Sequence, residues 1–342
     1  MSEAERTAAS DPIDAWLALL RCPACGSELT QGPDGTSLLC GRCPQCFPVR
    51  AGTLRMAGAT VIASEREERE RTAESFAYEW KRFGEAREEW ERNFLDYMRP
   101  HQPEFFCGLR VLDAGAGSGR HSRQAAIYGA DVAAVDLGES IDVARENVPP
   151  EVLTVQADLE RLPFEPGTFD LVMSIGVLHH LPDTERALRY LAGLARPGGR
   201  VRIYLYWQPE RRWQRAVLRA VSAARRITTR LPHRVLDLLC YPLAALLWLF
   251  VVKPYDLLRR HPATRRLAAG FPLQTYADYP FGVLVNDQFD RLSAPIERRY
   301  TAAEVERMMR DAGLGDVKVL PNAGWVAEGV ARSGAEAEDH TS

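Results

Sequence analysis

Residues 111–122 read VLDAGAGSGRHS, an apolar run that enters a glycine-rich loop and then a helix-like segment. Gly115, Gly117 and Gly119 permit a tight turn and let a ligand approach the backbone closely. The helix that follows offers unpaired N–H groups at its start. The stretch therefore predicts a strand, a ligand-binding glycine loop (residues 115–119) and a helix.

Two acidic residues distinguish this loop from a site for the pyrophosphate of NAD. Asp113 begins the D-x-G-x-G-x-G pattern, and Asp136 ends the next apolar run, about twenty residues beyond the glycines. A carboxylate at Asp113 repels a pyrophosphate but attracts an ammonium group. An acid at the position of Asp136 accepts hydrogen bonds from ribose hydroxyls. The pattern favours a ligand with a ribose and a positive charge.

The apolar runs alternate with helix-like stretches, which predicts an α/β fold with a parallel sheet covered on both faces. The alternation stops after the fifth run and returns near the C-terminus. We expect a tail and a small metal-held domain, a helical connector or lid, a two-part catalytic core, a helical insertion that caps the acceptor site, and a disordered tail. In that order their ranges are 1–60, 61–104, 105–207 with 295–331, 208–294, and 332–342.

Three further motifs follow the glycine loop in order: ADLERLPF (157–164), FDLVMSIGVLHHLPD (169–183) and LARPGGRV (194–201). With these motifs the sequence resembles the class I S-adenosylmethionine-dependent methyltransferases, in the branch that includes the ubiquinone and menaquinone C-methyltransferases. The resemblance covers about 105–207 and 295–330. It implies a Rossmann-like seven-stranded sheet with helices on both faces and S-adenosylmethionine as the methyl donor.

The resemblance also implies the donor-binding residues. The methionine end of the donor would face the first strand and its loop, the ribose and adenine would lie at the ends of the second and third strands, and the transferring methyl would lie past the fourth. The residues are Asp113, Gly115, Gly117, Asp136, Leu137, Asp158, Leu159, Ile175 and Gly176.

Catalytic and acceptor residues are less sharply indicated. His179 and His180 are candidates for a base, because imidazole titrates near neutral pH. The alternative is that LHHLPD marks a helix start, with one histidine packing inward and the other satisfying backbone groups. The resemblance places acceptor contacts on the helix before the sheet and on the insertion, which nominates Tyr78, Trp80, Asp287 and Arg291.

Five cysteines lie between positions 22 and 46. CPACG and CGRC supply Cys22, Cys25, Cys40 and Cys43, four thiolates at a spacing typical of a structural zinc site. Cys43 and Cys46 form an overlapping CxxC pair, so a second register is open. LLCGRC and FPVRAGTLRM resemble a short zinc-ribbon family that includes an activator subunit of tRNA and protein methyltransferases, and that resemblance favours the first four as ligands.

The expected insertion is basic and contains an apolar run, Val235 to Val252. Eighteen residues approach the length of a membrane span, but Asp237 and Pro242 interrupt the run and arginines flank both ends. We expect a helical lid over the acceptor pocket, a basic amphipathic surface that contacts an anionic membrane, or a helical cap that only completes the core.

Composition bounds the function. The chain of 342 residues has a formal net charge of −3, which provides no global attraction for nucleic acid. Its first residues lack the pattern of a signal peptide, so we expect a cytoplasmic protein with peripheral contact at the inner membrane face. The leading hypothesis is methyl transfer to a small-molecule or lipid-like acceptor. The alternatives are an RNA base methyltransferase that uses the ribbon and the basic insertion, and a non-catalytic docking module with a protein partner.

Overall fold

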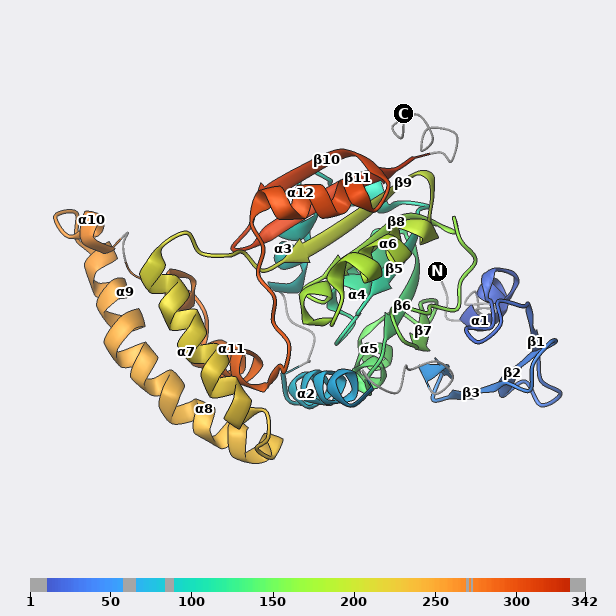
Figure 1. Ribbon diagram of the computed structural model, residues 1–342, viewed down its shortest axis with the longest axis horizontal. Helices are drawn as coiled ribbons and strands as arrows, with labels where there is room; N and C mark the ends of the chain where they lie inside the picture. The colour runs from blue at the N-terminus through green and yellow to red at the C-terminus, as the bar shows by residue number, and fades with distance from the viewer. Residues whose placement is uncertain (1–10, 58–65, 84–88, 269–270, 272, 333–342) are drawn as a thin grey trace, which may run out of the picture. The chain divides into compact units, whose positions relative to one another are not determined.

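The computed structural model describes residues 11–57, 66–83, 89–268, 271 and 273–332. Both expected tails fall almost wholly outside these residues. The chain divides into two compact units, the first made of Met1–Gln208 and Ile296–Ser342 and the second of Pro209–Pro295. Figure 1 shows the elements of both units.

The first unit is built on a mostly parallel sheet, as expected for the α/β class. Its seven core strands run in the order β7-β6-β5-β8-β9-β11-β10. The first five are parallel to one another, while β11 is antiparallel to both β9 and β10. Their bounds are β5 Arg110–Ala114, β6 Asp131–Asp136, β7 Leu153–Gln156, β8 Phe169–Ile175, β9 Ala195–Leu205, β10 Leu314–Pro321 and β11 Trp325–Ala331. The predicted seven-stranded sheet is confirmed as the core of a larger sheet of eleven strands.

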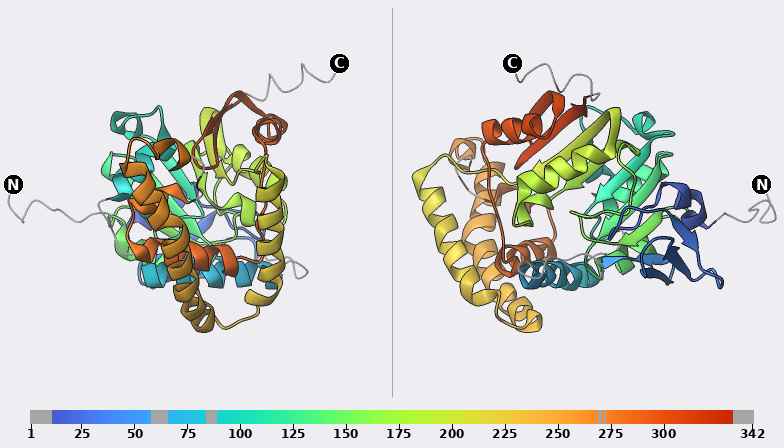
Figure 2. Two further views of the ribbon diagram at one scale, coloured as in Figure 1. Left: turned by 90° about the vertical axis from the view of Figure 1, so that its left-hand side faces the viewer. Right: turned by 45° about the vertical axis from the view of Figure 1, so that its right-hand side comes forward.

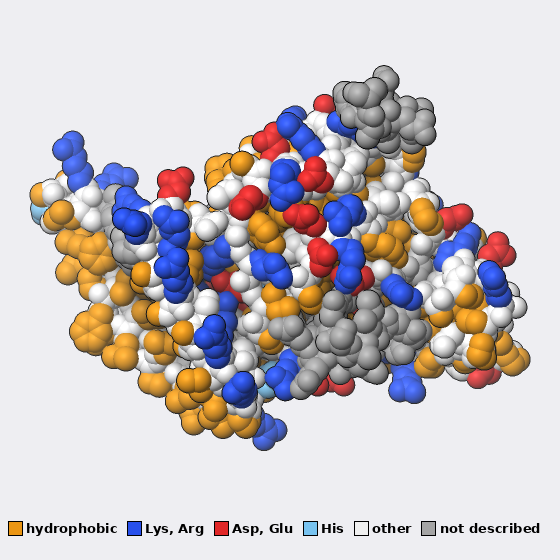
Figure 3. Space-filling model, viewed as in Figure 1, with side chains coloured by type: hydrophobic (Ala, Val, Ile, Leu, Met, Phe, Trp, Pro, Cys, Tyr) orange, Lys and Arg blue, Asp and Glu red, His pale blue; other side chains and the backbone are white. Residues whose placement is uncertain are grey.

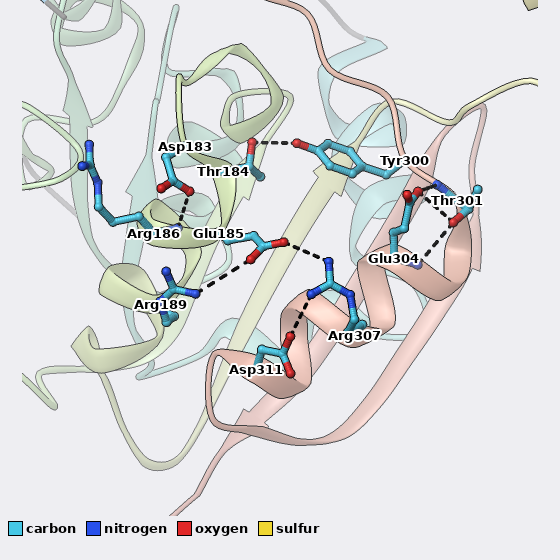
Figure 4. Close-up of polar contacts among 10 residues, drawn as sticks. All are labelled: Asp183, Thr184, Glu185, Arg186, Arg189, Tyr300, Thr301, Glu304, Arg307 and Asp311. Atoms are coloured by element: carbon cyan, nitrogen blue, oxygen red, sulfur yellow. Dashed lines mark hydrogen bonds and ion pairs between the residues drawn. The ribbon is translucent and has the colours of Figure 1, made fainter. Parts of the chain in front are cut away.

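Helices cover both faces of this sheet because neighbouring strand residues point to opposite sides. Val111 packs in one core with side chains of α3, α4 and α5, and Leu112 packs in the other with side chains of α6 and α12. In the second layer, Arg307 of α12 pairs with Glu185 of α6 at 2.9 Å, as Figure 4 shows. The bounds are α3 Glu89–Met98, α4 Arg120–Ile127, α5 Ser140–Asn147, α6 Thr184–Leu194 and α12 Ala302–Asp311.

The cysteine-rich segment extends the same sheet. Four short strands follow one another at its edge, and the last of them, β4, pairs in parallel with β7 through Thr53, Leu54 and Arg55. Their bounds are β1 Leu29–Gln31, β2 Ser37–Cys40, β3 Cys46–Arg50 and β4 Thr53–Arg55. The segment is therefore continuous with the seven core strands by backbone hydrogen bonding, a pairing that the cysteine spacing does not reveal.

A short helix, α1 (Pro12–Trp16), precedes the cysteine-rich segment and packs in the same hydrophobic core. Trp16 is buried, with its ring centroid 6.0 Å from that of Phe164 and 5.8 Å from that of Phe169. Leu20 forms an isolated bridge to Phe164. The start of the chain thus contributes to the same core as β8.

The second unit is helical, and Figure 2 shows its long helices from two sides. α8, a π-helical turn (η6) and α9 form one continuous helix, and α11 packs along α8. This helix, His233–Arg260, is 28 residues long and apolar enough to cross a membrane by length and composition. Of its most apolar 18-residue stretch, 22% is buried. Pro242 lies inside α8 without ending it. The bounds are α7 Arg212–Thr228, α8 His233–Leu247, η6 Trp248–Val252, α9 Lys253–Arg260, α10 Arg265–Ala268, η7 Gln274–Ala277 and α11 Phe281–Ser293.

Candidate active site and cysteine cluster

The glycine loop needs its glycines for steric reasons. Gly115 has a φ of +90°, and a Cβ atom added to it would lie 2.4 Å from a methyl carbon of Val177. Gly117 has a φ of +54°, and its added Cβ would lie 2.8 Å from Nε1 of Trp80. Residues that carry a side chain rarely adopt such positive φ values. Only glycine therefore fits at these two positions, because neighbouring side chains lie very close to the loop backbone.

Asp136 ties the ends of two strands together. Its Oδ2 accepts a hydrogen bond from the N–H of Gly117 at 2.9 Å, and its Oδ1 accepts from the N–H of Gly138 at 3.0 Å and from Oγ of Ser140 at 2.7 Å. Burial raises the pKa of this carboxyl, although these hydrogen bonds oppose the shift. The carboxylate lies between the glycine loop and the β6 end, where a ribose would meet both.

Asp113 is buried at the end of β5. Ser122 Oγ donates a hydrogen bond to its Oδ2 at 2.6 Å, and burial raises the pKa of the carboxyl to about 6. The Ser122 hydrogen bond and the charge of Arg120 favour the carboxylate and so oppose part of this rise in pKa. The Asp113 carboxyl therefore gains or loses its charge within reach of neutral pH.

The other predicted donor residues lie at the ends of the neighbouring strands. The carbonyl of Leu137 accepts from Nε2 of Gln156 at 3.1 Å, and Asp158 accepts from the N–H of Glu160 at 3.0 Å. An added Cβ on Gly176 would meet no atom within 4 Å, so open space lies beside it. Leu159 and Ile175 are buried. Because β5 to β8 are parallel, all nine predicted donor residues lie at or just beyond their carboxyl ends, where open α/β sheets bind ligands.

One helix of the connector, α2 (Arg66–Phe83), crosses this carboxyl edge. A Cβ on Gly138 would lie 2.9 Å from the carbonyl oxygen of Ala73, and the ring of Phe76 lies 5.0 Å from that of His180. The indole of Trp80 lies against Gly117, and the guanidinium of Arg120 lies 5.4 Å from its ring centroid. Trp80, nominated for the acceptor, therefore borders the donor loop.

The histidine pair is held inside the first unit. His179 is fully buried, and its ring lies 4.0 Å from that of Tyr206. Nδ1 of His180 lies 2.6 Å from the carbonyl oxygen of Ile296, so this nitrogen carries the proton and donates it. The backbone N–H of Arg298 donates to the carbonyl of His179. These contacts give both residues a structural role in fixing the chain where it re-enters the first unit.

The acceptor candidates belong to two different units. Tyr78 and Trp80 lie on α2 of the first unit, whereas Asp287 and Arg291 lie on α11 of the second. Tyr276 donates a hydrogen bond to Asp287, and Arg291 Nη2 donates to the Tyr276 hydroxyl at 3.4 Å. Burial and the Asp287 charge raise the pKa of Tyr276. Tyr276 is a member of this polar cluster that the sequence motifs do not indicate.

Four of the cysteines converge. The Sγ atoms of Cys22, Cys25, Cys40 and Cys43 lie within 4.8 Å of one another, and the Cys22–Cys43 and Cys25–Cys40 pairs are 3.6 and 3.4 Å apart. Sulfur atoms around a tetrahedral zinc, each about 2.3 Å from the metal, would have separations close to these. Cys46 is exposed and outside this cluster. The four cysteines, the cysteine cluster, fit a zinc ion in the register with Cys40 and Cys43.

Arg55 connects the cysteine-rich segment to the donor edge. Its Nη1 donates to Oε1 of Gln156 at 3.2 Å, and it also pairs with Asp142 of α5. Gln156 in turn holds the Leu137 carbonyl beside Asp136. Sequence reasoning missed Arg55 because its role depends on the pairing of β4 with β7.

The known proteins that resemble this chain match parts of it. Residues 112–203 match the family described as a methyltransferase domain. The ubiquinone biosynthesis O-methyltransferase of Coxiella burnetii strain Dugway 5J108-111 is 33% identical over 134 residues, 38% of this chain and 56% of that protein. The enzyme of the same name from Methylocella silvestris is 38% identical over 103 residues, 29% of this chain and 40% of that protein. This chain therefore spans about half the length of these curated relatives.

Among solved structures, the magnesium protoporphyrin IX methyltransferase of Synechocystis PCC 6803 with bound S-adenosylhomocysteine is similar at 16% identity. The alignment covers 79% of this chain and 100% of that chain, with a TM-score of 0.44. The 1,6-didemethyltoxoflavin-N1-methyltransferase of Burkholderia thailandensis is also 16% identical, over 84% of this chain and 96% of that chain, with a TM-score of 0.44.

Proposed function

We propose that this chain, which carries a methyltransferase domain over residues 112–203, transfers the methyl group of S-adenosylmethionine to a small-molecule acceptor. The observation that carries the proposal is the Asp136 carboxylate, which bridges the N–H groups of Gly117 and Gly138 beside a glycine loop. Such a carboxylate accepts ribose hydroxyl protons while the loop backbone approaches the donor.

The reaction breaks the bond between the sulfonium sulfur and the methyl carbon and joins that carbon to O, N or C of the acceptor. S-adenosylhomocysteine leaves, and the acceptor atom loses its proton to water or a base. Asp136 would hold the ribose and Asp113 the ammonium of the donor by charge attraction. Because the sulfonium is already activated, in-line placement of donor and acceptor supplies much of the rate. The chain's task is mainly to position both and to exclude water.

We further propose that the acceptor is hydrophobic or lipid-like and that the protein works in the cytoplasm with peripheral contact to the inner membrane face. Two observations support this. The relatives from Coxiella and Methylocella are named for ubiquinone biosynthesis, and a ubiquinone precursor is apolar. The second unit exposes large apolar side chains along α8 and α9.

The test is transfer of a labelled methyl group from S-adenosylmethionine into extracted lipids, quinones and RNA, with Asp136→Ala as the control variant. We expect label in the lipid or quinone fraction and none with the control. Label in RNA, lost at high salt, would replace the lipid-like acceptor with the RNA alternative. Absence of label from every fraction, by a protein that binds the donor, would contradict all three acceptor classes.

A further inference from the structure

The continuous helix His233–Arg260 presents an uncovered apolar face. Large apolar residues recur along it at spacings of four and seven, which places them on one side of a helix. Leu238 is 71% exposed, Phe250 67% and Leu257 73%. Figure 3 shows hydrophobic side chains gathered over α8 and α9. We call this face the apolar stripe; its members are Val235, Leu238, Leu239, Leu246, Leu249, Phe250 and Leu257.

The other side of the helix is already occupied by its own unit. Cys240 and Ala244 are buried, and α8 packs along α11, whose Phe289 is buried as well. Polar side chains also lie inside this unit, among them Asp237 and Gln288. The unit thus has an interior of its own, and it still leaves several leucines and a phenylalanine exposed on one face, which is unusual for a protein surface that faces water. The apolar stripe therefore has the character of a surface that meets an apolar phase.

The basic charge of the second unit indicates that this apolar phase is an anionic bilayer. Residues 209–295 contain 14 Lys or Arg and six Asp or Glu, whereas the whole chain has a net charge of −3. On the same helix, the exposed Lys253 has its Nζ 4.5 Å from the ring centroid of Trp248, and the side chain of Arg260, which pairs with Asp256, is 71% exposed. Long cationic side chains beside an apolar face reach the headgroups of an anionic bilayer while their stems stay in the apolar layer.

The geometry favours a helix that lies in the membrane plane over one that crosses it. At about 1.5 Å per residue, the helix is about 42 Å long, more than the roughly 30 Å hydrocarbon core. Crossing would bring the buried Asp237 into lipid and separate α8 from α11. A helix that lies flat inserts only the stripe, keeps Asp237 out of the lipid and leaves α8 packed on α11.

We propose that the second unit docks on the surface of a bilayer containing anionic lipid, with the apolar stripe inserted and the α11 side turned away from the lipid. The proposal deepens the proposed function, on which its purpose rests, because a membrane-resident acceptor would then be taken from that bilayer. The binding step itself requires no methyl transfer, so it can fail or succeed independently.

The experiment is flotation of the full chain with vesicles of phosphatidylcholine alone or of three parts phosphatidylcholine to one part phosphatidylglycerol. The test variant is Leu249→Asp with Phe250→Asp, both on the stripe. The matched control is Ile127→Asp with Leu320→Asp, which places the same two charges at exposed apolar positions of the first unit. Circular dichroism and S-adenosylmethionine binding are measured for each protein.

We expect the full chain and the control to bind the anionic vesicles, with weaker binding to phosphatidylcholine, and the test variant to bind at least about tenfold more weakly. High salt with carbonate should release the bound protein. The proposal is overturned by no vesicle binding, by equal binding of the test variant, or by protein that resists carbonate and so spans the membrane. A dimer that dissociates in the test variant, without vesicle binding, would assign the stripe to a second copy instead. If the unmutated full chain binds vesicles but not S-adenosylmethionine, the result contradicts the proposed function and leaves the membrane proposal standing.

Discussion

Replacement of Trp16 by Ala tests whether the N-terminal helix α1, which precedes the cysteine-rich segment, is part of the core of the first unit. Trp16 is 1% exposed and packs against Phe164 and Phe169, at ring centroid distances of 6.0 and 5.8 Å. Truncation of a fully buried aromatic side chain usually costs about 3–5 kcal/mol, because apolar contact is lost and a cavity remains. We expect the free energy of unfolding, from urea titration followed by circular dichroism, to fall by that amount.

Trp16→Phe is the matched control. The indole Nε1 of Trp16 has no hydrogen-bond partner among the residues that the structure describes, so phenylalanine forfeits volume but no hydrogen bond. We expect it to cost about 1–2 kcal/mol. A loss below about 1 kcal/mol for Trp16→Ala would refute the reasoning, since it would make the N-terminal helix peripheral to the sheet.

Three further predictions concern the two sites. Cys22→Ser should lower the midpoint of thermal unfolding by about 5–15 °C through loss of the metal, whereas Cys46→Ser should not; equal effects in calorimetry would contradict the ligand set. Since burial raises the pKa of Asp113 to about 6, its carboxylate is lost as the pH falls below that value. Donor affinity measured by titration should then weaken about tenfold from about pH 7 to about pH 5, and Asp113→Asn should bind weakly with little pH dependence; a pH-dependent variant would exclude Asp113 as the cause. His179→Gln with His180→Gln should lower the free energy of unfolding by about 2–4 kcal/mol and leave the pH profile of turnover unchanged, whereas loss of the fall in turnover at acidic pH would restore a role as a base.

The sequence predicts the central sheet because its signals there are local. The glycine loop, the acid at Asp136 and the alternation of apolar runs with helices each depend on neighbouring residues, and parallel strands then bring the predicted donor residues to one edge. The cysteine spacing likewise indicates a four-thiolate group, and the structure supplies the register that Cys43 and Cys46 left open.

What the sequence does not reveal depends on long-range pairing. β4 joins β7 across about one hundred residues, and the role of Arg55 follows from that pairing alone. The position of Trp80 against Gly117 depends on how α2 crosses the sheet edge. Side-chain patterns specify which face of an element is apolar, but not which distant element covers it.

The central claim is that this chain binds S-adenosylmethionine at the carboxyl edge of its sheet. The most direct measurement is calorimetric titration of the metal-loaded protein with S-adenosylmethionine and S-adenosylhomocysteine, beside the Asp136→Ala variant. The account predicts that both ligands bind and that the variant, though folded, loses at least about tenfold in affinity because the ribose hydroxyls lose a charged acceptor. A folded, metal-loaded protein that binds neither ligand would contradict the claim.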